Sequence, residues 1–193
     1  MMRIITATLS MVFLTLAGSV YAADPENTLM IEVSGQANGI IEIELLPDVA
    51  PKHVQRIKTL ARDGAYDDVV FHRVIAGFMV QTGDVKFGKR EGFKPRYAGQ
   101  GGSNYPDLVA EFSDVSFDRG VVGMARSQNP NSANAQFFIT LEPATHLDGQ
   151  YTVVGRVMSG QDIVDSIKLG SSTSNGAVSD PDVMTRVWIK SDE

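Results

Sequence analysis

The sequence predicts a mainly β fold, a closed antiparallel β-barrel capped by two α-helices. Short apolar runs alternate with polar residues, and turn-forming residues separate most of these runs. Only two segments have the apolar periodicity of a helix. Many short strands with two helices favour a barrel, because closing the sheet removes its exposed edges. The chain has 193 residues and no internal repeat, which fits a single domain.

A hairpin of two strands, over 29–33 and 41–45, opens the predicted fold. In the second strand three apolar residues alternate with two glutamates, as expected when one face is buried and the other meets solvent. Residues 35–39, with a glycine at each end, form the turn between the two strands.

The first helix begins at Pro51, since proline is tolerated in the first helical turn. Gly64 ends this helix, and Gly170 ends a second helix that is predicted over 161–169. The apolar stripe of the first helix consists of Val54, Ile57, Leu60 and Ala61. The remaining strands are expected over 69–75, 78–83, 120–125, 136–141, 152–158 and 184–190. Two long loops are expected over 85–103 and 171–180.

The N-terminus has the pattern of a secretory signal peptide over residues 1–22. Arg3 supplies a positive charge, an uncharged apolar run of about 17 residues follows, and Val-Tyr-Ala precedes a cleavage point before Ala23. The alternative is a retained membrane anchor, but the run is at the short limit for a span and contains Thr, Ser and Gly. We expect cleavage, a short polar tether over 23–27 and one domain over 28–193.

Composition narrows the function classes. The chain has no cysteine, which excludes a disulfide and a thiolate metal site and suits an oxidising compartment such as the bacterial periplasm, although eukaryotic secretion stays open. A net charge of −6 argues against wholesale nucleic-acid binding. The three histidines lack metal-ligand spacing, and the run at 83–90 has Arg90 where a phosphate-binding loop needs Ser or Thr. We expect no cofactor and no metal.

The segment 71–84 places one cation and one amide among large apolar side chains. In a strand Arg73, Met79 and Gln81 have the same parity and share a face, and Gly77 can supply a turn between them. No carboxylate, thiol or hydroxyl nucleophile is obviously part of the set. These side chains suit binding a peptide bond and changing its electron distribution without breaking it.

Three ordered segments closely resemble the cyclophilin-type peptidyl-prolyl cis-trans isomerases. They are FHRVIAGFMVQTGD at 71–84, GMAR with NSANAQFFIT between 123 and 140, and LDGQYTVVGRV at 147–157. The resemblance covers about residues 28–190. It implies an eight-stranded barrel with a helix over each end. It also implies an isomerase that acts on X-Pro bonds of unfolded or folding proteins, as a monomer.

The resemblance assigns catalysis to Arg73, Phe78 and Gln81. Rotation about a peptide bond costs roughly 18–20 kcal/mol because resonance gives it double-bond character. In the twisted state the prolyl nitrogen gains a lone pair, so a guanidinium beside it stabilises that state more than the planar one. On the residues alone, a structural arginine paired with an acid is at least as good an interpretation of Arg73.

The resemblance also implies a peptide-binding surface. Its pocket for the proline ring consists of Phe78, Met79, Phe138 and Leu147, whereas Phe71 and Phe137 are assigned to the core. Around the pocket, Gln81 and Gln136 are expected to supply neutral amides, and Ala125 and Arg126 to supply main-chain groups. Gly99 is expected to form a wall, and Tyr151 to add a second ring.

Three positions depart from the best-known patterns of the family. Arg126 stands where many relatives have Asn, and Tyr151 stands where the best-known eukaryotic pattern has His. His146 replaces a Trp, which puts tight binding of cyclosporin in doubt because an indole donor is lost.

Two functions remain open. The first is an isomerase that assists the folding of exported proteins, which the intact site residues favour. The second is a peptide-binding chaperone module with little dependence on catalysis. A basic cluster over 86–96 is interpreted as a solvated loop, in preference to an anion-binding or partner-binding site.

Overall fold

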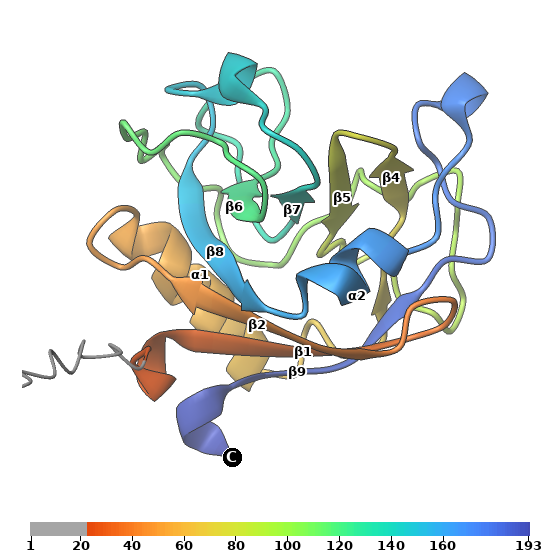
Figure 1. Ribbon diagram of the computed structural model, residues 1–193, viewed down its shortest axis with the longest axis horizontal. Coiled ribbons are helices and arrows are strands. Elements are labelled where there is room, and N and C mark those ends of the chain that lie inside the picture. The colour runs from red at the N-terminus through yellow and green to blue at the C-terminus, as the bar shows by residue number, and fades with distance from the viewer. Residues whose placement is uncertain (1–22) are drawn as a thin grey trace, which may run out of the picture.

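Short strands with buried apolar faces build one curled antiparallel sheet in the computed structural model, which describes residues 23–193 (Figure 1). The strands are β1 (Thr28–Ser34), β2 (Gly39–Leu45), β3 (Val69–Val70), β4 (Arg73–Ile75), β5 (Met79–Thr82), β6 (Val121–Met124), β7 (Phe137–Thr140), β8 (Val153–Ser159) and β9 (Val183–Ile189). The helices are α1 (Pro51–Arg62) and α2 (Gln161–Ser166), with short 3₁₀ turns at Pro25–Asn27, Thr145–Leu147, Ser172–Ser174 and Lys190–Asp192. The mainly β fold with two helices is therefore confirmed.

The predicted signal peptide lies outside the described residues. Among residues 23–193, no helix is both long enough and apolar enough to cross a bilayer. The predicted tether carries a 3₁₀ turn, in which Glu26 forms salt bridges with Lys58 and Arg62 of α1. The second half of this segment is therefore held against the domain.

The strand order is β3-β9-β1-β2-β8-β6-β7-β5-β4, with antiparallel pairing throughout. This linear order has nine strands, so the closed eight-stranded barrel is not confirmed. The single strand expected over 69–75 is divided at Phe71 and His72, and its halves form the two opposite edges of the sheet. The division arises because Phe71 N–H donates to the Asp182 carbonyl and His72 C=O accepts from Val178, so the 176–182 loop replaces a partner strand.

The core lies inside the curl of the sheet and under the helices. The apolar residues of β1, the predicted stripe of α1 and the apolar residues of β2 other than Ile40 are at most 5% exposed. Helix α1 contacts β9, and α2 contacts β2. Phe71 and Phe137 are fully buried, which confirms their assignment to the core. The prediction for α2 was three residues too long, because Ile167 turns to extended backbone and Lys168 N–H donates to the Asp182 carboxylate.

Asp84 anchors the long loop that follows β5. Its side chain is fully buried, and one carboxylate oxygen accepts from the N–H groups of Lys86 and Phe87 at 3.1 and 2.8 Å. The other oxygen accepts from Gly99 and Gly101 at 2.8 and 3.0 Å. A single carboxylate therefore joins the start of the loop to its end, where the site begins.

Asp84→Asn is expected to lower the free energy of unfolding by about 2–4 kcal/mol, because an amide NH₂ cannot accept and faces buried N–H donors. Urea unfolding monitored by tryptophan fluorescence measures the loss. The matched control is Asp114→Asn, a change of an exposed carboxylate, which is expected to cost less than about 0.5 kcal/mol. Equal stability of the two variants would contradict the anchoring role.

Candidate active site

The β4–β5 hairpin positions the two polar side chains of the signature segment. Arg73 lies opposite Gln81 in the register, and Gly77 in the turn has a φ of 67°, in the left-handed region that favours glycine. The next pairing places Gln81 opposite Phe138 of β7. Three neighbouring strands thus present a guanidinium, an amide and an aromatic ring in one row.

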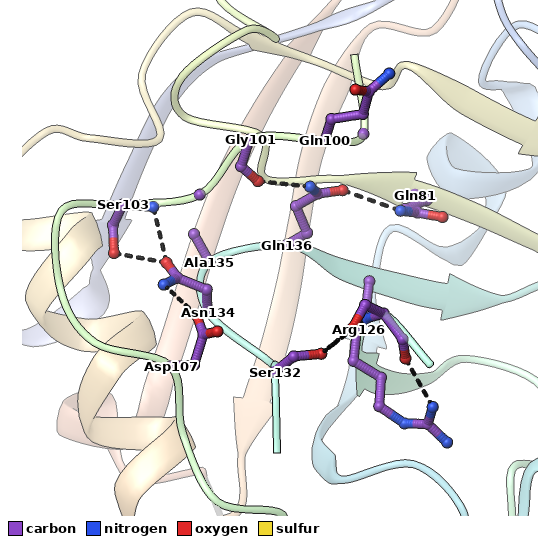
Figure 2. A pocket seen from close by; sticks show the side chains of 14 residues that line it. Gln81, Gln100, Gly101, Ser103, Asp107, Arg126, Ser132, Asn134, Ala135 and Gln136 are labelled. Atoms are coloured by element: carbon purple, nitrogen blue, oxygen red, sulfur yellow. Dashed lines mark hydrogen bonds between the residues drawn. The ribbon is translucent and has the colours of Figure 1, made fainter. Parts of the chain in front are cut away.

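A chain of hydrogen bonds orients Arg73. Its Nη1 donates to Gln81 Oε1 at 3.1 Å, and Gln81 Nε2 donates to Gln136 Oε1 at 3.0 Å. Gln136 Nε2 in turn donates to the carbonyl of Gly101 at 2.7 Å (Figure 2). Both amides use their two ends within the protein, so they align one another and the guanidinium. Direct contact of either amide with substrate stays a prediction.

Asn175 holds the other side of the Arg73 guanidinium. Arg73 Nε donates to the Asn175 carbonyl and Nη2 donates to its side-chain oxygen, both at 3.0 Å. Within residues 23–193 no carboxylate forms a salt bridge with Arg73. Burial lowers the pKa of Arg73, although an arginine stays charged at neutral pH. The described residues therefore do not contain the acid that a paired structural arginine would need.

A cavity of about 180 Å³, lined by both apolar and polar side chains, lies beside the guanidinium. Nine of the predicted site residues line it: Arg73, Phe78, Met79, Gln81, Ala125, Arg126, Phe138, Leu147 and Tyr151. We refer to it as the proline cavity. Gly99 and Gln136 do not line it. His146 is exposed outside it, with its ring centroid 5.5 Å from that of Phe78.

Packed rings form one wall of the proline cavity. Phe138 stacks on Phe117 with centroids 5.6 Å apart and meets Tyr151 edge-on at 5.8 Å. Gly123 makes this possible, since a Cβ there would lie 2.6 Å from both phenylalanine rings. Arg126 stacks on Tyr151, with its guanidinium carbon 4.3 Å from the ring centroid. Two of the three positions that depart from the family patterns are thus in contact.

A second, more polar cavity of about 520 Å³ adjoins the first and shares Gln81, Ala125 and Arg126 with it. Figure 2 shows this cavity, whose lining includes Gln136 and the wall of Gly99, Gly101 and Gly102. The Ala125 N–H already donates to the Gln136 carbonyl at 2.9 Å, so only its carbonyl remains for a peptide. The expected main-chain contact of Ala125 with a peptide stays a prediction, now limited to its carbonyl because sheet pairing uses its N–H.

Sequence reasoning missed several residues that support the site. Asn134 accepts from the backbone and hydroxyl of Ser103, both at 2.7 Å, and donates to Asp107. Asn175 and Asp84 were also missed. The only sequence signals were an Asn inside the second resembling segment and an Asp directly after Gly83.

Known proteins resemble this chain in both sequence and fold. A family model described as "Cyclophilin type peptidyl-prolyl cis-trans isomerase/CLD" matches residues 28–189. The chain belongs to the cyclophilin-type peptidyl-prolyl cis-trans isomerases. A Brucella suis protein named "Probable peptidyl-prolyl cis-trans isomerase" is 59% identical over 172 residues, which is 89% of this chain and 86% of that protein.

Two solved cyclophilins have the same fold. AquaCyp293 from Hirschia baltica aligns with a TM-score of 0.72 at 25% identity, over 89% of this chain and 76% of that chain. A cyclophilin-type isomerase of Cryptosporidium parvum, solved in the presence of the dipeptide Ala-Pro, aligns with a TM-score of 0.69 at 26% identity. That alignment covers 84% of this chain and 98% of the other.

His72, the neighbour of Arg73 in this cyclophilin, is buried at 5% exposure. Burial lowers the pKa of His72 to about 4, opposed by the nearby charge of Asp84. The imidazole is therefore neutral between pH 6 and 8 and adds no second cation beside the guanidinium.

His72 should make the fold acid-sensitive. Its pKa is about 4 in the folded state and about 6.5 when unfolded, so the unfolded chain binds more protons between these values. Stability is therefore lost as pH falls from about 6.5 to 4. Relative to His72→Gln, the wild type is expected to lose about 2–3 kcal/mol between pH 7 and pH 4.5. Urea unfolding of both proteins at the two pH values measures this, and a difference that does not change with pH would contradict it.

Arg126 should act through Tyr151. The Arg126→Ala variant loses the cation–π interaction that holds the Tyr151 ring, which contributes about 0.5–1.4 kcal/mol. We therefore expect KM for a proline peptide to rise about 2- to 10-fold, with little change in kcat. Tyr151→Phe keeps the ring and is the matched control with a near-normal KM. Unchanged kinetics of Arg126→Ala would show that Tyr151 keeps its position without the stack.

Proposed function

We propose that this cyclophilin isomerises X-Pro bonds with the proline ring in the proline cavity and Arg73 as donor to the prolyl nitrogen. The observation that carries the proposal is the Arg73 guanidinium, which has no salt-bridging acid among residues 23–193 and lines this cavity. The Cryptosporidium relative solved with Ala-Pro supports a proline-containing ligand.

The arrangement suits a catalyst that weakens amide resonance without forming a covalent intermediate. As the bond twists, the prolyl nitrogen becomes pyramidal and can accept a hydrogen bond, which the planar amide accepts poorly. Arg73 is already oriented by Gln81 and Asn175, so little reorganisation is needed when that lone pair forms. The apolar walls exclude water, which strengthens the interaction and favours the less polar twisted amide.

A peptide-binding chaperone with little catalysis is the alternative. Either function could use the two adjoining cavities. The isomerase is favoured because a groove that only binds does not need a half-buried cation held from both sides at the proline cavity. Burial lowers the pKa of Arg73 and therefore carries a free-energy cost, which a donor role explains.

Arg73→Ala is expected to lower kcat/KM about 100- to 1,000-fold, because one preorganised donor stabilises a transition state by roughly 2.7–4 kcal/mol. Arg73→Lys should recover only part of this, since an ammonium lacks the planar fork that Gln81 and Asn175 hold. A coupled assay on a proline tetrapeptide measures the rates. Arg156→Ala, which removes a surface ion pair with Glu44, is the control. Wild-type activity of Arg73→Ala would favour the chaperone alternative.

We also propose that the protein is exported to the bacterial periplasm and assists folding there as a monomer. The N-terminal pattern of residues 1–22 and the absence of cysteine support export. The Brucella relative shows that similar chains occur in bacteria. Seven large apolar side chains are exposed among residues 23–193, at positions that extend along the chain from β2 to the loop after α2, which supports a monomer.

Mass spectrometry of protein from the periplasmic fraction is expected to find an N-terminus at or near Ala23. Ala22→Arg places a large charge before the cleavage point and should leave the precursor in the membrane fraction. Ala76→Ser, a small change in an exposed turn far from that point, should be processed normally. An uncut N-terminus in the wild-type protein would favour the retained anchor.

A further inference from the structure

A third cavity, of about 310 Å³, lies against Arg73 between two loops. We call it the loop cavity. Phe93, Pro95 and Ala98 contribute from the long loop that Asp84 anchors, and Ser174 and Asn175 contribute from the loop after α2. These two loops run side by side at the right of Figure 1. The loop cavity shares Arg73 and Gln81 with the proline cavity, so a bound peptide can reach both.

The lining of the loop cavity offers hydrogen-bond donors and no carboxylate. No Asp or Glu is among its lining residues, although the chain has 23 acidic residues. Arg73, Gln100 and Ser174 can donate to a bound group. A lining without acids is suited to a negatively charged ligand.

His72 is a buried, unpartnered polar group on this lining. It is 5% exposed, and neither of its ring nitrogens makes a hydrogen bond of regular geometry within residues 23–193, although the Val70 backbone and the Gln136 side chain lie close enough to act on its pKa. The ring faces Gly99, where an added Cβ would lie 3.3 Å from His72 Nε2, and Gly99 also lines the cavity. A neutral imidazole has one N–H to donate, and leaving it unpaired is costly. Both ring nitrogens are covered, so a ligand in the loop cavity meets a neutral ring without reaching its N–H.

Exposed cations neighbour the lining of the loop cavity along the chain. Of the basic cluster over 86–96, Lys89 binds the carbonyl of Ala65 and Arg90 pairs with Asp68. The three others are exposed and form no salt bridge within residues 23–193: Lys86, Lys94 and Arg96. Lys94 and Arg96 flank Pro95, which lines the cavity. Their field attracts anions toward its mouth.

We propose that the loop cavity is a substrate subsite for the carboxylate of an Asp or Glu that lies within two residues of the isomerised proline. The proposal rests on the proposed function, since Arg73 joins this cavity to the proline cavity. The carboxylate accepts from Gln100 and Ser174 inside, and the exposed cations Lys94 and Arg96 attract it. Clients with an acidic residue near proline are then preferred over neutral ones.

The test compares matched proline hexapeptides that carry Glu or Gln at each of the two positions before and the two after proline. For the wild type, kcat/KM is expected to be about 5- to 20-fold higher for Glu than for Gln at one position and nearly equal at the others. Because Lys94 and Arg96 are exposed, 0.5 M NaCl should reduce this preference at least about 3-fold.

The double variant Lys94→Gln/Arg96→Gln is expected to reduce the preference for Glu to below about 2-fold. Lys52→Gln removes an exposed cation from α1, outside the cavity lining, and should keep the wild-type preference. A preference near one at every position, or one that survives the double variant, would overturn the proposal. If the Gln peptides are turned over and this turnover depends on Arg73, the proposed isomerase function stands even when the subsite proposal fails. If no peptide is turned over, both the subsite proposal and the proposed function are overturned.

Discussion

The antiparallel register of β4, β5 and β7 is the constraint on which the site depends. It places Arg73 opposite Gln81 and Gln81 opposite Phe138, so a guanidinium, an amide and an apolar wall occupy one row. A shift of one residue in β4 would turn Arg73 to the other face of the sheet, because side chains alternate with period two. Strand pairing therefore determines which side chains face the site in this protein.

Buried polar groups then connect the sheet to its loops. Asp84 ties both ends of the long loop together, and the Gly101 carbonyl, next to that anchor, accepts from Gln136. Through Gln136 and Gln81 the loop is linked to Arg73 by consecutive hydrogen bonds. The loop thus supports the orientation of the guanidinium as well as forming the walls of two cavities.

The electrostatics of the site centre on Arg73, a half-buried cation that, like its neighbour Arg126, forms no salt bridge within residues 23–193. Arg73 is held by amide and carbonyl oxygens, which align its charge without cancelling it. Its neighbour His72 stays neutral because burial lowers the pKa of the imidazole. The charge is therefore available for a group that appears on the substrate as the bond twists.

The sequence by itself determined the family, the alternation of the strands, the start of α1 and all nine residues that line the proline cavity, because these follow from local periodicity and from three ordered segments. Only the tertiary structure decided the division of 69–75 into two sheet edges, the early end of α2, the contact of Arg126 with Tyr151 and the anchoring by Asp84. Each of these depends on partners distant in sequence and on burial, and a local pattern encodes neither.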